Sequence, residues 1–288
     1  MQILLEEPIT FDVGSGEPRA QTHAPMVEAR VEGAITRLIL DTGSTDHILR
    51  TALAEQVGLV AEPGEAGTDS SGASVPSWRL PQVSVQIGAR RFAFVDVVAI
   101  DGPPQFADWG IGGIVSPQHL HPSATAILDL VGNRFFLVDG PWTDISAWLR
   151  TRHPDMHALE LDPVDGDGTV LIRAAVEPFD PVVTMLDTGA RGTYFGAAAV
   201  PGLEGGARLS AGRGVGGTES FGHEAPDRVL LAGDARLNLR RLLVRPEMGD
   251  PAGPAAGLVG MDVLRGTVLA VSADSTHPIL WLLAAPES

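Results

Sequence analysis

Apolar and polar residues alternate over many short stretches of this chain, and Gly, Pro, Asp and Ser separate the stretches. Residues 26–33 (MVEARVEG) alternate in the manner of a strand with one buried face. Residues 83–87 and 92–98 are two more strand-like runs, and the turn residues Gly88-Ala89-Arg90-Arg91 between them predict a hairpin. A clear helix is predicted only over residues 50–57, which a glycine follows. The pattern therefore predicts an all-β fold.

One short motif occurs twice. The tripeptide Asp-Thr-Gly stands at residues 41–43 and again at 187–189, and each copy directly follows a strand-like apolar run. The two aspartates are 146 residues apart. Because each of these residue types has an ordinary frequency, a chance copy is expected in only about a few per cent of chains of this length. Two copies in the same local setting indicate an internal repeat.

The surroundings of the two copies match as well. Residues 110–114 (GIGGI) resemble residues 257–261 (GLVGM), so that Gly113 follows its aspartate by 72 residues and Gly260 follows its own by 73. We therefore expect one design of roughly 120 residues to be present twice. The predicted domains are an N-terminal lobe over residues 1–140, a linker over 141–167 and a C-terminal lobe over 168–288.

Composition narrows the fold class further. The chain has 288 residues, of which 44% are apolar, and it contains 34 glycines and 22 prolines. This size fits one large domain or two small ones, and the many turn-forming residues argue against helical bundles and coiled coils. No apolar run is long enough for a membrane helix, and the N-terminus, with Glu6, Glu7 and Pro8, does not resemble a signal peptide.

Charge and cysteine content exclude several classes of function. The net charge is −16, and all 20 basic residues are arginines. Such an acidic chain is repelled by nucleic-acid phosphates and anionic membranes, so we expect neither as a partner. The chain has no cysteine, which excludes disulfides, thiol catalysis and cysteine-ligated zinc. Without an export signal or disulfides, we expect it in the cytoplasm of a bacterium-like cell.

The repeated aspartates suggest specific chemistry. A carboxylate at the end of an apolar strand is costly to bury, and two of them brought together by the repeat would share one proton. The ionised partner can take a proton from water while the protonated partner donates one to a carbonyl. Thr can hydrogen-bond across the repeat, and the following Gly lets the two loops approach closely.

These motifs resemble those of the aspartic proteases. The sequence apolar-apolar-Asp-Thr-Gly-(Ser/Ala), with an apolar-apolar-Gly turn much later, covers residues 24–140 and 168–284. The short spacing and compact halves are more similar to retropepsin-like proteases than to pepsin. Retropepsins carry one motif per chain and form homodimers, whereas this chain carries both motifs. The resemblance implies a two-lobed, pseudo-two-fold acid-protease fold built from tandem retropepsin-like lobes, and a monomer.

The resemblance also implies roles for individual residues. Asp41 and Asp187 would form the catalytic pair, and Thr42 and Thr188 would form hydrogen bonds across the axis. The supporting set comprises the two threonines with Gly43, Ser44, Gly189 and Ala190, together with Gly113 and Gly260, which would mark the loops packed under each aspartate.

Three departures from the family pattern affect the expected activity. The residues after the two motifs differ, because Ser44 can donate a hydrogen bond to Asp41 whereas Ala190 cannot do so for Asp187. Pepsin-like flaps carry a tyrosine, but the only tyrosine here is Tyr194, which we expect in the core. Arg191 stands where retropepsins often have an aspartate; it either pairs with Asp262 or contacts an acidic substrate. Flap hairpins are expected near residues 68–74 and 214–219, with Ser70, Ser71, Gly72, Gly216 and Gly217 as candidates.

The sequence therefore predicts an aspartic endopeptidase that hydrolyses peptides or proteins without a cofactor or a metal. The alternatives are a catalytically silent peptide-binding module that retains this fold and a structural or interaction protein. Retention of both aspartates and both threonines favours the enzyme.

Overall fold

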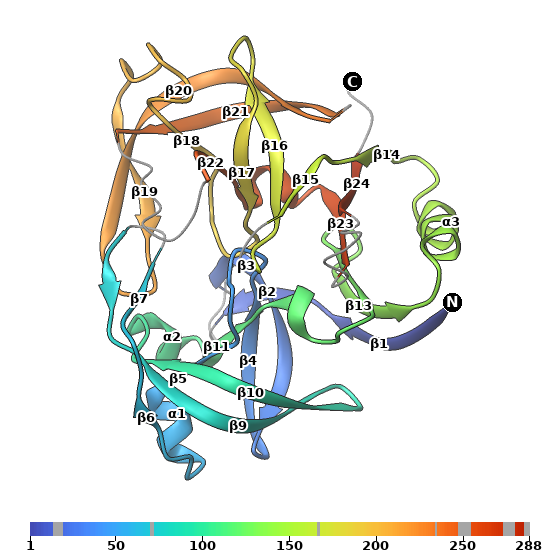
Figure 1. The fold of residues 1–288 in the computed structure, drawn as a ribbon, viewed down its shortest axis with the longest axis vertical. Helices are drawn as coiled ribbons and strands as arrows, with labels where there is room; N and C mark the ends of the chain where they lie inside the picture. Colours follow the sequence, from blue (N-terminus) through green and yellow to red (C-terminus); the bar gives the residue numbers. More distant parts are fainter. Residues whose placement is uncertain are drawn as a thin grey trace.

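The computed structural model describes residues 1–13, 20–69, 72–165, 168–233, 235–246, 255–272 and 280–284. Two similar eight-stranded sheets form two lobes, and a six-stranded sheet joins them (Figure 1). The structure confirms the all-β, two-lobed architecture.

The N-terminal lobe contains the first Asp-Thr-Gly motif. Its central strands β4 (Ala34–Leu40) and β11 (Ile111–Val115) run parallel, and β3 (Ala20–Val31) and β5 (Ile48–Arg50) flank them. In sheet order the strands are β2 (Thr10–Val13), β3 (Ala20–Val31), β4 (Ala34–Leu40), β11 (Ile111–Val115), β5 (Ile48–Arg50), β10 (Arg90–Ile100), β9 (Trp78–Ile87) and β6 (Glu62–Pro63). The separate hairpin β7 (Gly67–Thr68) and β8 (Ser74–Val75), the helices α1 (Thr51–Gln56) and α2 (Gln105–Asp108), and the 3-10 helix η1 (Pro117–His119) complete the lobe.

The C-terminal lobe repeats this order strand by strand. Its central strands β17 (Val182–Leu186) and β22 (Gly257–Val259) are again parallel. The order is β15 (Pro163–Val164), β16 (Leu171–Val176), β17 (Val182–Leu186), β22 (Gly257–Val259), β18 (Tyr194–Gly196), β21 (Ala235–Arg245), β20 (Glu219–Ala232) and β19 (Arg208–Arg213), and the short helix α4 (Met261–Leu264) follows β22. Equivalent strand orders give the two lobes the pseudo-two-fold relation expected from the repeat.

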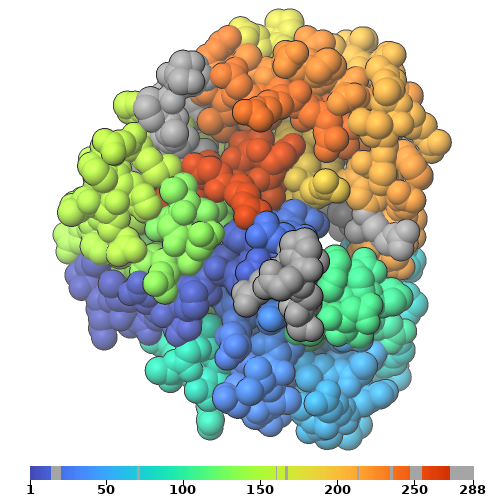
Figure 2. Space-filling view, turned by 180° about the vertical axis from the view of Figure 1, so that it is seen from behind, coloured from blue at the N-terminus to red at the C-terminus, as the bar shows by residue number. Residues whose placement is uncertain are grey.

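The third sheet takes strands from both halves of the chain. In Figure 1 it lies to the right of the two lobes, with α3 (Trp142–Arg152) packed beside it. In Figure 2 the red segment at residues 260–272 lies between orange residues of the C-terminal lobe and blue residues of the N-terminal lobe. The strands are β1 (Gln2–Pro8), β13 (Arg134–Asp139), β12 (Thr125–Asp129), β23 (Thr267–Ser272), β24 (Leu280–Ala284) and β14 (His157–Glu160). The lobes are thus joined by main-chain pairing of β12 with β23.

Local sequence accounts for the long hairpin of the N-terminal lobe. Strands β9 and β10 bury Val83, Val85 and Ile87 on one face, as the alternation predicts. The turn is tighter than expected, because Arg90 already pairs with Ile87. Gly88 has φ = 55°, a backbone conformation that favours glycine.

Helices contribute little to the described part of the chain. Helix α1 confirms the prediction made for residues 50–57. Within the described residues, no helix combines the length and the apolar character needed to cross a bilayer.

Candidate active site

The two aspartates occupy equivalent places at the ends of central strands. Asp41 follows β4, and its amide donates to the Val115 carbonyl at 2.9 Å. Asp187 follows β17, and its amide donates to the Val259 carbonyl at 3.0 Å. Each aspartate is therefore held by the parallel strand beside it.

Thr42 and Thr188 connect the two motifs. The Thr42 amide donates to Thr188 Oγ1 at 3.1 Å, and the Thr188 amide donates to Thr42 Oγ1 at 3.1 Å. Each hydroxyl then donates to a carbonyl of the opposite strand, Thr42 to Leu186 at 2.6 Å and Thr188 to Leu40 at 2.7 Å. Both threonines are fully buried, so these four bonds fix the loops against each other, as the resemblance implied.

The glycines after the threonines bring the carboxylates together. A Cβ atom on Gly43 would lie 2.7 Å from Cγ of Asp187, and a Cβ atom on Gly189 would overlap the Asp41 carboxylate. Each carboxylate therefore faces the loop of the other lobe. The Gly43 amide donates to Asp41 Oδ1 at 2.8 Å, and the Gly189 amide donates to Asp187 Oδ1 at 2.8 Å.

Burial and proximity set the protonation of this pair. Burial raises the pKa of Asp41, and the hydrogen bonds from Asp187 and from the amides of Gly43 and Gly189 partly offset this increase. The pKa of Asp187 lies well above the ordinary value, because the group is buried and the negative charge of Asp41 is close. Only 8% of Asp187 is exposed. Of the two carboxyls, Asp187 therefore has the stronger tendency to hold a proton.

The expected role of Ser44 is wrong. Its hydroxyl donates to the backbone carbonyl of Asp46 at 2.7 Å rather than to the Asp41 carboxylate. At the equivalent position, the Ala190 amide donates to Asp187 Oδ1 at 2.9 Å. The Ser44 hydroxyl therefore does not cause the difference between the two carboxyls, because it bonds its own loop.

The pairing of Gly113 with Gly260 is also wrong. Strand register places Gly113 opposite Leu38 in the first lobe and Gly257 opposite Thr184 in the second. Since Leu38 and Thr184 each lie three residues before their aspartates, Gly113 corresponds to Gly257. The first lobe has two more residues than the second between its aspartate and this glycine. Matching glycines by their distance from the aspartates therefore aligned Gly113 with Gly260 instead of Gly257.

Ser116 takes the place of Gly260 in the first lobe. The Ser116 amide donates to His47 Nδ1 at 3.2 Å, and the Gly260 amide donates to Thr193 Oγ1 at 3.2 Å. His47 and Thr193 each lie six residues after their aspartates. Burial lowers the pKa of His47 to about 4, so its ring is neutral at pH 7 and can accept this bond. The equivalence of Ser116 and Gly260 can be found in the sequence by aligning residues 114–116 with residues 258–260.

Arg191 does not pair with Asp262. The Asp262 carboxylate accepts a 2.7 Å hydrogen bond from Thr193 Oγ1 and a 3.1 Å bond from the Thr193 amide. Arg191 is exposed, and within the described ranges its guanidinium makes no ion pair. His23 of β3 contacts the same loop, since its Nε2 atom is 2.8 Å from the carbonyl oxygen of Gly189, two residues before Arg191 in the chain. This contact joins residues 166 positions apart, and no local signal in the sequence indicates it.

An apolar cluster separate from the main core lies on the strand before each aspartate. Because successive strand residues alternate between faces, Ile39 of β4 and Met185 of β17 lie on the opposite face from the core residues Leu40 and Leu186. Ile39 and Met185 each belong to one of these separate clusters. The N-terminal cluster consists of Val13, Ala24, Met26, Ile39, Ile111 and Ile114, with Ile48, Phe106, Trp109 and Val215 packed against it.

The two candidate flap hairpins contact each other. Gly216 and Gly217 lie in the turn between β19 and β20, and Gly72 lies in the turn between β7 and β8; Ser70 and Ser71 fall outside the described residues. Asp69 Oδ2 accepts a 3.0 Å hydrogen bond from the Gly216 amide. Val215, beside it, packs against the apolar cluster of the other lobe.

Tyr194 does not belong to either hairpin. It lies in β18 and is only 5% exposed, in agreement with its expected place in the core. Burial raises the pKa of its hydroxyl, and the Arg245 guanidinium lies 5.7 Å from its ring centroid.

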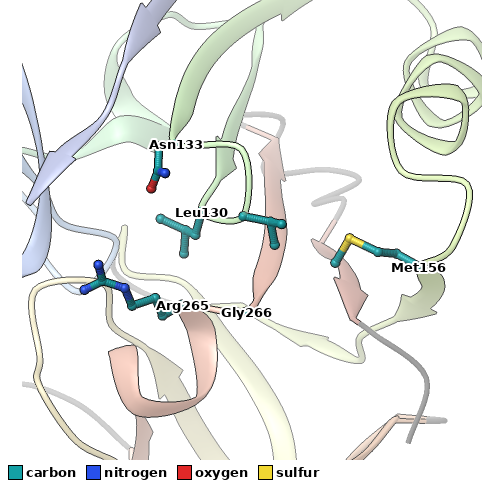
Figure 3. A pocket seen from close by; sticks show the side chains of 6 residues that line it. Leu130, Asn133, Met156, Arg265 and Gly266 are labelled. Atoms are coloured by element: carbon teal, nitrogen blue, oxygen red, sulfur yellow. The ribbon is translucent and has the colours of Figure 1, made fainter. Parts of the chain in front are cut away.

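Two surface pockets lie outside the dyad. One of about 450 Å³ is lined by Leu130, Val131, Asn133, Met156, Arg265 and Gly266, beside the β12–β13 turn and the start of β23 in the shared sheet (Figure 3). The other, of about 390 Å³, lies on the N-terminal lobe between the Thr45–His47 loop and β10. Neither contains Asp41 or Asp187. No cluster of three metal-ligating side chains occurs among the residues that the structure describes.

Comparison with known proteins agrees with this geometry. Residues 27–114 match the family described as aspartyl protease. The match contains the first Asp-Thr-Gly motif and does not extend to the second. No curated protein matches the chain significantly.

Proposed function

We propose that this chain, whose N-terminal lobe is similar to aspartic proteases of the retropepsin-like type, is an aspartic endopeptidase with both catalytic carboxyls in one polypeptide. The observation that carries the proposal is the reciprocal bonding of Thr42 and Thr188, which holds Asp41 and Asp187 against each other at the ends of equivalent strands. If each Asp-Thr-Gly motif were only a structural turn, it would need neither a second copy nor the buried contact between the two threonines.

In the proposed first step, a water molecule attacks the scissile carbonyl carbon. Asp41, the ionised partner, takes a proton from this water, and Asp187 donates its proton to the carbonyl oxygen. The product is a neutral tetrahedral diol, and the proton has moved from one carboxyl to the other. The raised pKa of Asp187 supports its role as the acid.

In the second step, the diol collapses. Asp187 takes back a proton from a diol hydroxyl, Asp41 protonates the leaving nitrogen, and the C–N bond breaks. The amides of Gly43, Gly189 and Ala190 support this cycle, because they hold the carboxylates in a fixed geometry throughout.

The proposed substrates are peptides or proteins, and the proposed setting is the cytoplasm. The two hairpins that meet through Asp69 and Gly216 would cover a bound peptide. Since one chain supplies both aspartates, the active unit is proposed to be a monomer. Activity per molecule should then be the same from nanomolar to micromolar protein, and a sedimentation analysis over that range should give a single monomeric species.

The test is cleavage of a diverse peptide library, read by mass spectrometry with and without a statine inhibitor. We expect cleavage that the inhibitor blocks and that Asp41→Asn and Asp187→Asn each abolish. Asp227→Asn is the matched control, because Asp227 is an exposed aspartate with φ = 50°, which asparagine also adopts. Turnover in either dyad variant would refute the mechanism. A folded wild type that binds statine but cleaves nothing would be a silent peptide-binding module.

A further inference from the structure

The second Asp-Thr-Gly loop presents a cation that has no ion-pair partner among the described residues. Arg191 follows Asp187 by four residues and is exposed. The acidic residue beside it in the fold, Asp262, uses both carboxylate oxygens to bind Thr193, and its amide donates to the Arg191 carbonyl at 3.1 Å. The backbone of Arg191 is therefore fixed while its guanidinium is available, among the described residues, to an outside group.

His23 contacts the loop that carries both Asp187 and Arg191. Its Nε2 atom lies 2.8 Å from the carbonyl oxygen of Gly189, two residues before Arg191. The charges of Arg191 and Asp41 both influence the His23 ring, in opposite directions. Burial is the main cause of the lowered pKa of His23, with the Arg191 charge adding to it. The ring is therefore neutral at pH 7, and the charge at this place belongs to the arginine.

The first loop carries no such cation. Thr45 occupies the position equivalent to Arg191, and its hydroxyl donates to Asp46 Oδ2 at 2.8 Å. Asp46 also lies 3.7 Å from the Arg79 guanidinium, so this loop satisfies its own charges. Within the described part of the chain, the two sides of an otherwise symmetric dyad thus differ by one guanidinium without an ion pair.

We propose that Arg191 is a specificity-determining residue that binds a carboxylate of the substrate at one fixed position beside the scissile bond. This proposal rests on the proposed proteolytic function and adds a substrate class to it: peptides with an acidic group on the side of the second motif. A guanidinium suits this role, because its planar donors match the two oxygens of a carboxylate and it stays charged at every working pH.

The acidic surface of the chain does not remove this preference. A net charge of −16 slows the approach of an acidic peptide, but exposed charges more than about 10 Å away are largely screened at 0.1 M salt. The direct contact with Arg191 is much shorter. Since glutamate has an ordinary pKa of about 4.3, the preference should be strong above about pH 5 and fade below about pH 4.

The experiment compares peptides with Glu or Gln at each position around the cleaved bond, with free and with amidated C-termini. We expect about a ten-fold higher kcat/KM for Glu over Gln at a single position in the wild type. Arg191→Met should bring the ratio near one, Arg191→Lys should retain part of it, and Arg191→Glu should favour a basic residue there. Arg30→Met, which changes an exposed arginine near the β3–β4 turn, is the control and should keep the wild-type ratio.

The same variants are tested for binding of statine peptides that carry Glu or Gln at that position. This readout does not need turnover, so it separates the two proposals. Cleavage without any Glu preference, or a preference that survives Arg191→Met, would overturn the role of Arg191 and leave the protease intact. If no peptide is cleaved but the statine peptide with Glu still binds more tightly than the one with Gln, the proposed protease activity is refuted and the proposed carboxylate site is retained. A preference confined to free C-termini would assign the bound carboxylate to the chain end.

Discussion

Thr42 and Thr188 hold each other by two reciprocal hydrogen bonds of equal length, 3.1 Å from each amide to the opposite hydroxyl. Both side chains are fully buried, so no water can replace a bond that is lost. The contact between the lobes and the geometry of the carboxylates therefore depend on the same two hydroxyl groups.

Removing one of these hydroxyls should weaken folding and activity together. Thr42→Val deletes the donor to the Leu186 carbonyl and the acceptor for the Thr188 amide, which leaves two buried groups unsatisfied. At about 1–3 kcal/mol for each group, we expect a loss of about 2–6 kcal/mol in the free energy of unfolding. Urea denaturation measures this loss. Thr42→Ser retains the hydroxyl and serves as the control; an equal loss in both variants would show that the methyl group matters instead.

Neutralising the dyad should stabilise the protein at neutral pH. Because the folded pKa of Asp187 lies above its unfolded value, the folded state binds more protons than the unfolded state between those two values. Wild-type stability should therefore fall as the pH rises from about 4 through the raised pKa, by about 1.4 kcal/mol for each pH unit that separates the unfolded and folded pKa values. Asp187→Asn should remove this fall and have the higher Tm at pH 7. A lower Tm for Asp187→Asn at pH 7 would contradict the raised pKa.

Ala190→Ser should leave the pH profile of activity almost unchanged. In the first lobe, the equivalent Ser44 hydroxyl donates to the carbonyl of the second residue after it, Asp46. A serine at position 190 is expected to donate to the Gly192 carbonyl in the same way and not to Asp187. We expect a bell-shaped dependence of kcat/KM on pH whose basic limb lies above the ordinary carboxyl range and moves by less than about 0.3 pH unit in the variant. A clear shift toward acid would show that the hydroxyl reaches Asp187.

The turns under the two aspartates should tolerate substitution differently. A Cβ atom on Gly260 would lie 2.5 Å from the Gly192 carbonyl oxygen, which is backbone and cannot rotate away. Gly260→Ala should therefore cost about 1–3 kcal/mol. Ser116→Ala removes the 2.8 Å bond to the Ser44 carbonyl and should cost about 1 kcal/mol. Thermal unfolding compares the two variants, and a Gly260→Ala variant as stable as the wild type would argue against the steric explanation.

The contact between the hairpins should control how often they open. Asp69 Oδ2 accepts from the Gly216 amide at 3.0 Å, and Asp69 Oδ1 accepts from the Ala73 amide at 3.3 Å. Asp69→Ala should speed hydrogen exchange of the Gly216 amide about five-fold, since a half-exposed, charge-assisted bond contributes about 1 kcal/mol. Exchange at the Leu38 amide, inside β4, is the internal reference. Unchanged exchange at Gly216 would mean that Asp69 does not hold the hairpins together.

Much of the architecture follows from the sequence. Period-two alternation identified strands such as β3 and β9 because one face of each is buried, and the repeated Asp-Thr-Gly marked the two strand ends. The reciprocal bonds of Thr42 and Thr188 agree with their predicted role, because a small polar residue between an aspartate and a glycine has few other uses in a buried loop.

Other features depended on the tertiary structure. Spacing from the aspartates paired Gly113 with Gly260, but strand register decided that Ser116 and Gly260 are equivalent. Likewise, hydroxyl chemistry alone allowed Ser44 to reach Asp41, and only the path of the loop directed it to Asp46. The contacts of His23 with Gly189 and of Asp69 with Gly216 join residues 166 and 147 positions apart. Local pattern determines which residues are buried and where strands end, whereas register and the packing of the two lobes determine which polar atoms meet.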